Sequence, residues 1–322
     1  MINKHLITGI TGQDGLFLTN YLQKEGNNVI GISRSKNNNT FLSNLKYLNN
    51  KIDLNNIEIK NINLTISEEV STFISEYKPD YIFNFSGPSS VYESIENPIE
   101  SKNQIENIFL NLVDSCSQNN CFPNFFQASS SQMFDISENK LNEESKFLPK
   151  SPYAEAKLNV HLKVGDLRKR YDWNINSGIM FNHESEFRDN NYLFMKIINI
   201  AIKIKENKET KLTVGSLDLI RDWSYAADFT EVIHSIASDP IGDDYVIGSG
   251  KGTTIKEVIE IIFSYFDLDW EKYINIDKKL LRKGDSEKIV SEPKKIYEKF
   301  NWKTETSVEN LIEKCIKFKL KN

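Results

Sequence analysis

Short apolar runs and polar, glycine-containing breaks alternate along the first half of the chain. Residues 5–8 (HLIT) are followed by a glycine-rich break, by a segment with helical periodicity from Leu16, and by a second apolar run at residues 29–32 (VIGI). The helical segment stops at Gly26, and glycine commonly follows the end of a helix. The pattern predicts a buried strand, a helix and a second buried strand.

The alternation continues to about residue 178. Further short apolar runs, each expected to be a strand, lie at residues 57–62, 81–85, 124–127 and 175–179. Strands that are separated by helices favour a parallel sheet with helices on both faces. The expected fold class is therefore α/β.

The second half of the chain has a less regular pattern. Apolar runs predict strands at residues 211–214 and 245–247. Helical periodicity predicts helices at residues 192–206, 227–237, 254–266 and 308–318.

Length and pattern together predict two domains, because 322 residues are enough for two lobes. The first is expected to comprise residues 1–178, with residues 215–245 returning to it, and to hold a dinucleotide. Residues 179–214 and 246–322 are expected to form mainly a smaller domain that closes over a second ligand. Ligands of such folds lie beyond the carboxyl ends of the strands.

Three glycines stand where the first helix should begin. Gly9, Gly12 and Gly15 follow the first apolar run with the spacing G-x-x-G-x-x-G. Glycine permits φ > 0 in a tight turn and lets a pyrophosphate approach main-chain N–H groups at the positive end of a helix. The turn predicts a dinucleotide site, although glycine triplets also occur in ordinary turns.

The end of the second strand bears on the choice of dinucleotide. An NAD-dependent enzyme usually has Asp or Glu there to bind the ribose 2′-hydroxyl, whereas this chain has the sequence SRSK at residues 33–36. A guanidinium attracts a 2′-phosphate, which a carboxylate would repel. We therefore expect Arg34 to favour NADP over NAD; the alternative is that Arg34 and Lys36 are solvated loop charges.

Composition argues against several classes of protein. The formal net charge is −5 without a basic stripe, which argues against nucleic acid as a partner. The chain has no basic-then-apolar leader and no apolar run of about 18 residues, so we expect a cytoplasmic protein without a membrane segment. Its three cysteines and four scattered histidines form neither a metal-binding pattern nor a disulfide framework, so no metal site is expected.

A tyrosine and a lysine are the candidate catalytic pair. Tyr153 and Lys157 stand in the segment SPYAEAK at the start of a predicted helix, so both side chains lie on one face. A neighbouring ammonium lowers the pKa of a phenol from its ordinary value of about 10 toward the range of a useful base. Upstream, the segment QASSSQMF ends a strand with three hydroxyls, one of which can hold the reacting oxygen. Without these neighbours, a Y-x-x-x-K pair would be interpreted as an incidental surface pair.

At these residues the chain resembles the extended short-chain dehydrogenase/reductase superfamily and, within it, the GDP-mannose 4,6-dehydratase family. The resemblance runs nearly end to end and is most specific in GITGQDG (residues 9–15), FNHES (residues 181–185) and RDW (residues 221–223). It implies a Rossmann-type doubly wound parallel sheet with a smaller C-terminal α/β substrate-binding domain. It also implies NADP as cofactor, a GDP-linked sugar as substrate, and a homodimer or homotetramer.

The resemblance assigns roles to single residues. In the catalytic group, Ser130 takes the position of a threonine, Tyr153 is the base, and Lys157 holds the ribose and tunes the tyrosine. The implied cofactor site comprises Gly9, Thr11, Gly12, Gln13, Asp14, Gly15, Arg34, Asn63, Leu64, Tyr153, Lys157 and His183. The implied substrate site comprises Asn182, Glu184, Lys196, Arg221 and Arg282. Its cations suit a diphosphate, with which charge-assisted contacts are strongest.

One catalytic position departs from the family. Two residues after the catalytic hydroxyl the family has a glutamate that moves the proton in the elimination step, and this chain has Gln132. The family reaction oxidises C4 of the sugar, removes water across C5 and C6, and returns the hydride. An amide cannot take the proton in the second step. Glu93, Glu155 and Glu184 are other candidate bases, without a geometric argument in their favour.

Three functions therefore remain as hypotheses. The first is a GDP-mannose 4,6-dehydratase-like enzyme in which another group or a water supplies the lost base. The second is an epimerase or a 4-keto reductase or dehydrogenase that acts on a GDP-sugar without dehydration, with Gln132 bound to the sugar. The third is a cofactor-holding protein without turnover. Departures at residues 85–88 and 133–135, at Asn63 and at Met195 indicate an altered sugar pocket.

Overall fold

The computed structural model describes residues 3–137, 140–208, 211–281 and 287–321. The chain divides into two compact units. The first comprises Met1–Phe134, Phe147–Met180 and Phe229–Tyr245; the second comprises Asp135–Lys146, Phe181–Asp228 and Val246–Asn322. None of the described helices combines the length and the apolar character that crossing a bilayer requires.

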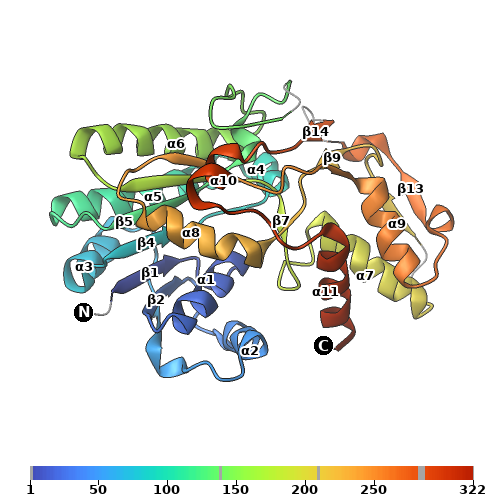
Figure 1. Ribbon diagram of the computed structural model, residues 1–322, viewed down its shortest axis with the longest axis horizontal. Coiled ribbons are helices and arrows are strands. Elements are labelled where there is room, and N and C mark those ends of the chain that lie inside the picture. The colour runs from blue at the N-terminus through green and yellow to red at the C-terminus, as the bar shows by residue number, and fades with distance from the viewer. Residues whose placement is uncertain (1–2, 138–139, 209–210, 282–286, 322) are drawn as a thin grey trace. The chain divides into compact units, whose positions relative to one another are not determined.

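The first unit is built on a seven-stranded sheet with the strand order β11-β6-β5-β4-β1-β2-β3 (Figure 1). Its strands are β1 (Lys4–Thr8), β2 (Asn28–Ser33), β3 (Ile57–Asn61), β4 (Tyr81–Asn84), β5 (Asn124–Ser130), β6 (Ile175–Met180) and β11 (Asp244–Ile247). From β3 to β6 all neighbouring strands pair in parallel. Chain order runs outward from β1 in both directions, so the carboxyl ends of β1 and β4 form a topological switch point, where ligands of this architecture bind.

Helices cover both faces of this sheet (Figure 1). α3, α4, α5 and α6 pack together on one face, and α1, α2 and α8 pack on the other. Their bounds are α1 (Gln13–Lys24), α2 (Asn39–Leu48), α3 (Ser67–Tyr77), α4 (Val91–Glu96), α5 (Pro98–Gln118), α6 (Pro152–Tyr171) and α8 (Phe229–Ser238).

Alternation along the strands produces the two helical layers. Leu6 and Ile82, on neighbouring strands, are fully buried in the apolar cluster that contains residues of α3, α5 and α6. His5 and Tyr81 precede them and face the other layer, where both rings lie within 6 Å of the ring of His234 on α8. Successive side chains of a strand point to opposite faces, so this sheet is the buried middle layer.

The second unit is built from short strands and helices. β7 (His183–Glu184) pairs with β10 (Ser224–Tyr225), β8 (Leu212–Val214) pairs with β13 (Ile274–Ile276), and β9 (Ile220–Arg221) lies between β12 (Thr253–Thr254) and β14 (Lys288–Ile289). The helices are α7 (Leu193–Lys205), α9 (Ile255–Tyr265), α10 (Lys294–Phe300) and α11 (Val308–Lys321). α7, α9 and α11 pack on one another.

The predicted α/β class with a doubly wound sheet is confirmed. Two elements of the first unit differ from the prediction: β5 is longer, and α2 was not predicted. β5 extends beyond the predicted residues 124–127 through Ser130, so Ser129 and Ser130 are buried strand residues. α2 lies in an asparagine-rich segment with no predicted helix. Its Phe41 and Leu45 are buried four residues apart, so packing stabilises a helix that propensity alone does not favour.

The boundary of the second unit also differs from the predicted domain. Residues 215–228 were expected in the first domain but belong to the second unit, as do Asp135–Lys146; only Phe229–Tyr245 returns to the first unit. The reason is local: the carboxylate of Asp228 accepts bonds from the N–H and the hydroxyl of Thr306, and its carbonyl accepts from the indole of Trp302. These bonds tie the segment to the C-terminal part of the chain.

Candidate active site

The turn between β1 and α1 requires glycine. Gly9 has a φ of +69°, and a Cβ there would lie 3.0 Å from the backbone of Phe85. In the first turn of α1, a Cβ on Gly15 would lie 2.6 Å from the Cα of Ile10. Gly12 is the exposed N-cap of α1 and has no side chain to cap it. The first N–H groups of a helix have no acceptor within the helix, so this N-terminus suits a pyrophosphate.

We expect Gly15→Ala to lower the free energy of unfolding by about 1–3 kcal/mol, because the new methyl group meets backbone that cannot move aside. Gly165→Ala in α6 is the matched control. A Cβ there meets nothing within 4 Å. It should raise the free energy of unfolding by about 0.5–1 kcal/mol through helix propensity. Urea unfolding followed by circular dichroism measures both; equal effects would contradict the proposed crowding.

The carboxyl ends of β2 and β3 carry the residues predicted to contact the nucleoside. The Asn61 amide donates to the carbonyls of Ser33 and Arg34 at 3.0 and 2.9 Å, which fixes the backbone there. Arg34 itself is exposed. Asn63 is exposed just after β3, and Leu64 is buried. A cation at this position is accessible to a ligand that lies along the glycine turn.

Tyr153 and Lys157 lie in the first turns of α6, whose N-terminus is capped by the hydroxyl of Ser151. Both side chains are 8% exposed. Lys157 Nζ donates to the carbonyl oxygen of Ala128 on β5 at 3.0 Å and lies 5.8 Å from the centre of the Tyr153 ring. Burial lowers the pKa of Lys157 to about 8, which the charge of Asp14 partly opposes. The ammonium is therefore placed to stabilise a tyrosinate.

The serine segment joins this pair from β5. Ser130 is the last residue of β5, and its hydroxyl accepts from the backbone N–H of Gln132 at 3.3 Å, across the single turn η2 (Ser131–Met133). Gln132 is partly exposed. Lys157 donates to the carbonyl of Ala128, two residues before Ser130 on β5. The first unit thus brings together the predicted catalytic residues of β5, η2 and α6. The candidate bases Glu93 and Glu155 are exposed.

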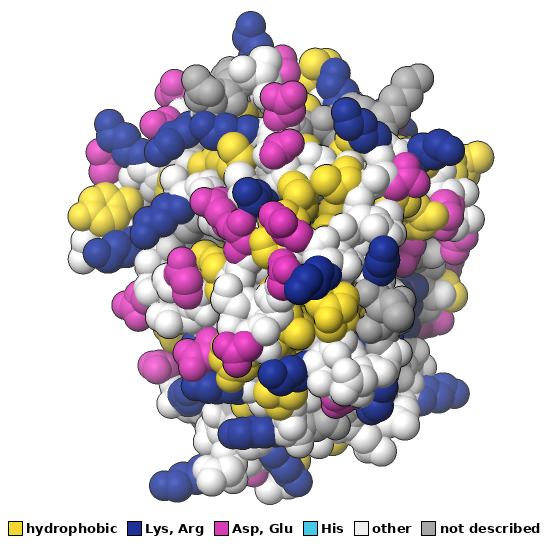
Figure 2. Space-filling view, turned by 90° about the vertical axis from the view of Figure 1, so that its right-hand side faces the viewer, with side chains coloured by type: hydrophobic (Ala, Val, Ile, Leu, Met, Phe, Trp, Pro, Cys, Tyr) yellow, Lys and Arg dark blue, Asp and Glu magenta, His cyan; other side chains and the backbone are white. Residues whose placement is uncertain are grey.

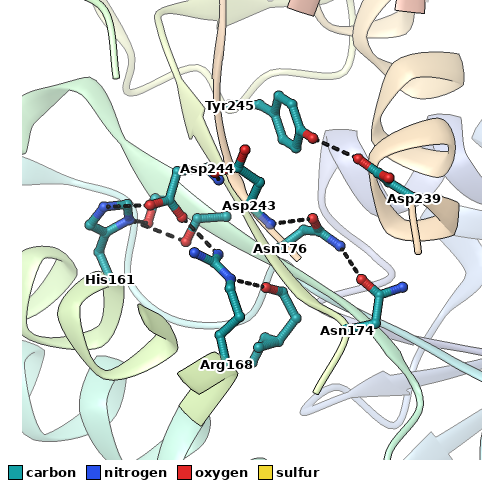
Figure 3. A network of polar contacts seen from close by, with 11 residues as sticks. His161, Arg168, Asn174, Asn176, Asp239, Asp243, Asp244 and Tyr245 are labelled. Atoms are coloured by element: carbon teal, nitrogen blue, oxygen red, sulfur yellow. Dashed lines mark hydrogen bonds and ion pairs between the residues drawn. The ribbon is translucent and has the colours of Figure 1, made fainter. Parts of the chain in front are cut away.

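The later turns of α6 are anchored by a partly buried polar network (Figure 3). Arg168 donates to the carbonyl of Ile175 and pairs with Asp244, both at 2.9 Å. His161 Nε2 lies 3.7 Å from Asp244, and its Nδ1 lies 3.3 Å from the hydroxyl of Ser129. Burial lowers the pKa of His161. The network ties α6 to β5, β6 and β11 and so fixes the helix that carries the tyrosine and the lysine.

The second unit contains the predicted sugar-nucleotide residues. The backbone carbonyl of Asn182 accepts a bond from the N–H of Ser224 at 3.0 Å, at the start of the β7–β10 pair. His183 and Glu184 form β7; Glu184 is buried and lies 3.3 Å from Nε of Arg188. The pairing fixes the backbone of these three consecutive residues, and the side chains of His183 and Glu184 point to opposite faces of the strand.

The three predicted cations are placed differently. Arg221 ends β9, is 8% exposed, and donates to the carbonyl of Ile220 at 2.9 Å. Lys196 is exposed on α7, whereas the neighbouring Met195 is in the core. Arg282 lies outside the described residues. Among the described residues, no group of three or more His, Cys, Asp or Glu side chains could hold a metal ion.

Sequence reasoning missed Asp222, which is fully buried next to Arg221. Its carboxylate accepts from the N–H and hydroxyl of Ser249, the N–H of Gly250, and the N–H and hydroxyl of Ser291, at 2.5–3.2 Å. These bonds hold together β9, the 249–250 turn and the segment that follows β14. The signal in the sequence was an acidic residue between Arg221 and Trp223 in the RDW motif. All three residues are buried, and a buried carboxylate needs hydrogen-bond partners.

We expect Asp222→Asn to lower the free energy of unfolding by about 1–3 kcal/mol, because the amide NH2 would face N–H donors that now have an oxygen acceptor. Asp218→Asn is the control, since Asp218 is exposed. Thermal unfolding measures both. A similar small effect of the two substitutions would show that the buried carboxylate is not required.

A model of the family described as GDP-mannose 4,6 dehydratase matches residues 6–315. The chain belongs to the GDP-mannose 4,6-dehydratase family. The predicted resemblance is therefore confirmed. GDP-mannose 4,6 dehydratase 2 of Arabidopsis thaliana is 32% identical over 317 residues, which cover 97% of this chain and 85% of that protein. Membership makes the chain an enzyme of this family.

Similar solved structures confirm that this chain has a Rossmann-type fold. UDP-glucose 4-epimerase from Bifidobacterium longum in complex with NAD+ and UDP has a TM-score of 0.85 and 19% identity, covering 99% of this chain and 98% of that chain. RMD from Pseudomonas aeruginosa complexed with NADPH has a TM-score of 0.81 and 17% identity, covering 98% of each chain. Likeness at these identities concerns the fold.

Proposed function

We propose that the protein is an NADP-dependent enzyme that modifies a GDP-linked sugar through a 4-keto intermediate, in the manner of a GDP-mannose 4,6-dehydratase. The observation that carries this proposal is the position of Lys157 Nζ, 5.8 Å from the ring centre of Tyr153. The pair lies at the carboxyl end of a parallel sheet whose first strand in the chain is followed by the glycine turn. Membership of the dehydratase family supports the class of substrate.

The residues of the first unit have separate chemical tasks in this proposal. Tyr153, as the phenolate, would take the proton of the sugar 4-hydroxyl and later give it back. Lys157 would stabilise the phenolate, and the hydroxyl of Ser130 would hold the reacting oxygen. When bound, NADP supplies a nicotinamide ring that accepts a hydride and returns it. Residues 9–15 and Arg34 would hold the dinucleotide.

Gln132 supports a second candidate, an epimerase or a 4-keto reductase or dehydrogenase that acts on a GDP-sugar without dehydration. Loss of water across C5 and C6 needs a base that removes the C5 proton, and an amide does not take up a proton near neutral pH. Hydride transfer at C4 does not need that base. In this second function Gln132 would bind the sugar by hydrogen bonds.

One experiment distinguishes the candidates. The purified protein is incubated with GDP-mannose and NADP+, and the products are analysed by mass spectrometry and NMR. A loss of about 18 Da supports elimination, an unchanged mass with an altered sugar spectrum supports epimerisation, and a change of about 2 Da supports net redox chemistry. Absence of any product with GDP-mannose and other GDP-sugars would contradict both candidates and favour a protein that holds the cofactor without turnover.

Arg34 should determine the preference for NADP over NAD. We expect Arg34→Ala to weaken NADP binding by about tenfold, equivalent to about 1.4 kcal/mol, because an exposed guanidinium beside a phosphate is lost. NAD binding should change little, since NAD has no 2′-phosphate. Isothermal titration measures both dissociation constants. Lys36→Ala is the matched control two residues along the same loop; an equal loss in the control would contradict a specific role of Arg34.

The proposed contacts to the nucleotide-sugar are Asn182, Glu184, Lys196, Arg221 and Arg282.

Basic and acidic side chains are interspersed on the face of the protein in Figure 2, and the described side chains there form no basic stripe. This face therefore lacks the basic stripe that is typical of a nucleic-acid-binding surface.

We also propose a homodimer or homotetramer. Tyr92 and Ile95 on α4 and Ile99 on α5 are 60, 50 and 76% exposed on helices that pack together. A group of exposed apolar side chains is typical of an interface. Light scattering measures the mass in solution.

A further inference from the structure

A row of buried polar side chains crosses the sheet at the carboxyl ends of three neighbouring strands. Thr8 on β1 is in register with Asn84 on β4, and Asn84 is in register with Gln127 on β5. All three are less than 4% exposed. Two residues earlier on each strand, the corresponding positions are occupied by apolar residues of the core cluster that faces α3, α5 and α6. The polar row therefore points to the face of the sheet that α6 covers.

The members of the row are joined by hydrogen bonds in one direction. The Thr8 hydroxyl donates to Oδ1 of Asn84 at 2.6 Å, and Nδ2 of Asn84 donates to Oε1 of Gln127 at 2.8 Å. Nε2 of Gln127 then donates to the carbonyl oxygen of Ala128 at 2.9 Å. That same oxygen accepts from Lys157 Nζ at 3.0 Å. The row thus ends at the acceptor that receives the catalytic lysine.

This arrangement orients groups and does not conduct protons. Side-chain amides do not release a proton near neutral pH, so no proton passes through Asn84 or Gln127. Each amide is instead held by a donor on one side and an acceptor on the other. A buried, fully bonded row of this kind has one arrangement, because reversing either amide would oppose two donors or two acceptors.

We propose that Thr8, Asn84 and Gln127 are positioning residues that hold the Ala128 carbonyl and thereby orient Lys157 toward Tyr153. The inference rests on the proposed function only in the role given to Lys157. The three side chains have no other described polar partner that accounts for the row, apart from the N–H of Ser86, which donates to Oδ1 of Asn84 at 3.3 Å. Their burial beneath α6 would otherwise favour apolar residues.

The first test measures the proton affinity of Lys157 without cofactor or substrate. Lys157 is acylated with trace acetic anhydride over a range of pH, and its modification is quantified by peptide mass spectrometry. We expect a midpoint near pH 8 in the parent protein. In Gln127→Glu the carboxylate can still accept from Asn84 but places a negative charge beside the Ala128 carbonyl. The midpoint should rise by one unit or more, with Asp14 and Tyr153, the other titratable neighbours of Lys157, unchanged.

Gln118→Glu makes the same chemical change at an exposed position at the end of α5 and should leave the midpoint where it is. A midpoint for Lys157 that is the same in Gln127→Glu and Gln118→Glu would overturn the proposal. A shift that is confined to Gln127→Glu shows that the side chain at position 127 is coupled to Lys157, whether or not any sugar is converted; the orienting role itself is tested with Thr8 below. The result is therefore independent of the proposed function, which fails separately if no GDP-sugar reacts.

A second test uses the far end of the row. Thr8→Val keeps the shape of the side chain and removes the hydroxyl, whereas Thr8→Ser retains it. We expect Thr8→Val to lower kcat about tenfold with an unchanged KM for the dinucleotide, and Thr8→Ser to restore kcat to within about twofold. An unchanged kcat in Thr8→Val would overturn the proposal, and a change confined to KM would also overturn it, because Thr8 would then act only through the neighbouring glycine turn. This pair decides the matter if Gln127→Glu does not fold.

Discussion

Tyr153→Phe is expected to reduce the rate of hydride transfer by about 10²–10⁴-fold, because it removes the group that we propose takes the proton of the sugar hydroxyl. Only one oxygen is lost, and the ring remains in its place in the core cluster. The free energy of unfolding should therefore change little, as should the dissociation constant of the dinucleotide. Single-turnover absorbance of the reduced nicotinamide measures the rate, and isothermal titration measures binding.

Tyr171→Phe provides the matched control, since Tyr171 is an exposed tyrosine at the end of the same helix. It should leave the rate unchanged. A Tyr153→Phe protein that is folded, binds the dinucleotide and still transfers hydride at the parent rate would remove Tyr153 from the chemistry. The proposed function would then have no base for its first step.

The sequence predicted the parts of the fold that depend on local chemistry. The glycine turn was predictable because a positive φ at Gly9 and a close approach at Gly15 demand the smallest residue. The pairing of Tyr153 with Lys157 was predictable because residues four apart share a helix face. Both features are encoded in fewer than ten consecutive residues.

Features that depend on register or on distant partners were not predictable. Thr8, Asn84 and Gln127 form a row only because the strands are aligned as they are, and spacing along the chain does not indicate that alignment. Asp222 is bonded to Ser249 and Ser291, residues 27 and 69 positions away. Two-residue strands such as β9 are likewise too short to produce a hydrophobic period.

Gln132→Glu is expected to raise the rate of water loss from the 4-keto sugar by about 10²–10⁴-fold, equivalent to about 3–5 kcal/mol. A glutamate has nearly the same shape as glutamine, but its carboxylate can accept the C5 proton that the amide cannot. Gln132 is partly exposed, so the new charge keeps part of its hydration and the folded state should tolerate it. The measurement is the rate of appearance of a product that is lighter by about 18 Da.

Gln132→Met is the matched control, because it removes the amide without supplying a base, and it should not accelerate water loss. An unchanged rate in Gln132→Glu, with hydride transfer intact, would mean that the sugar no longer lies where a residue at this position can reach C5. The substitutions at residues 133–135 would then be part of a pocket that has moved the sugar. In that case the non-eliminating function is favoured, since Tyr153 and Lys157 can act at C4 without any base at position 132.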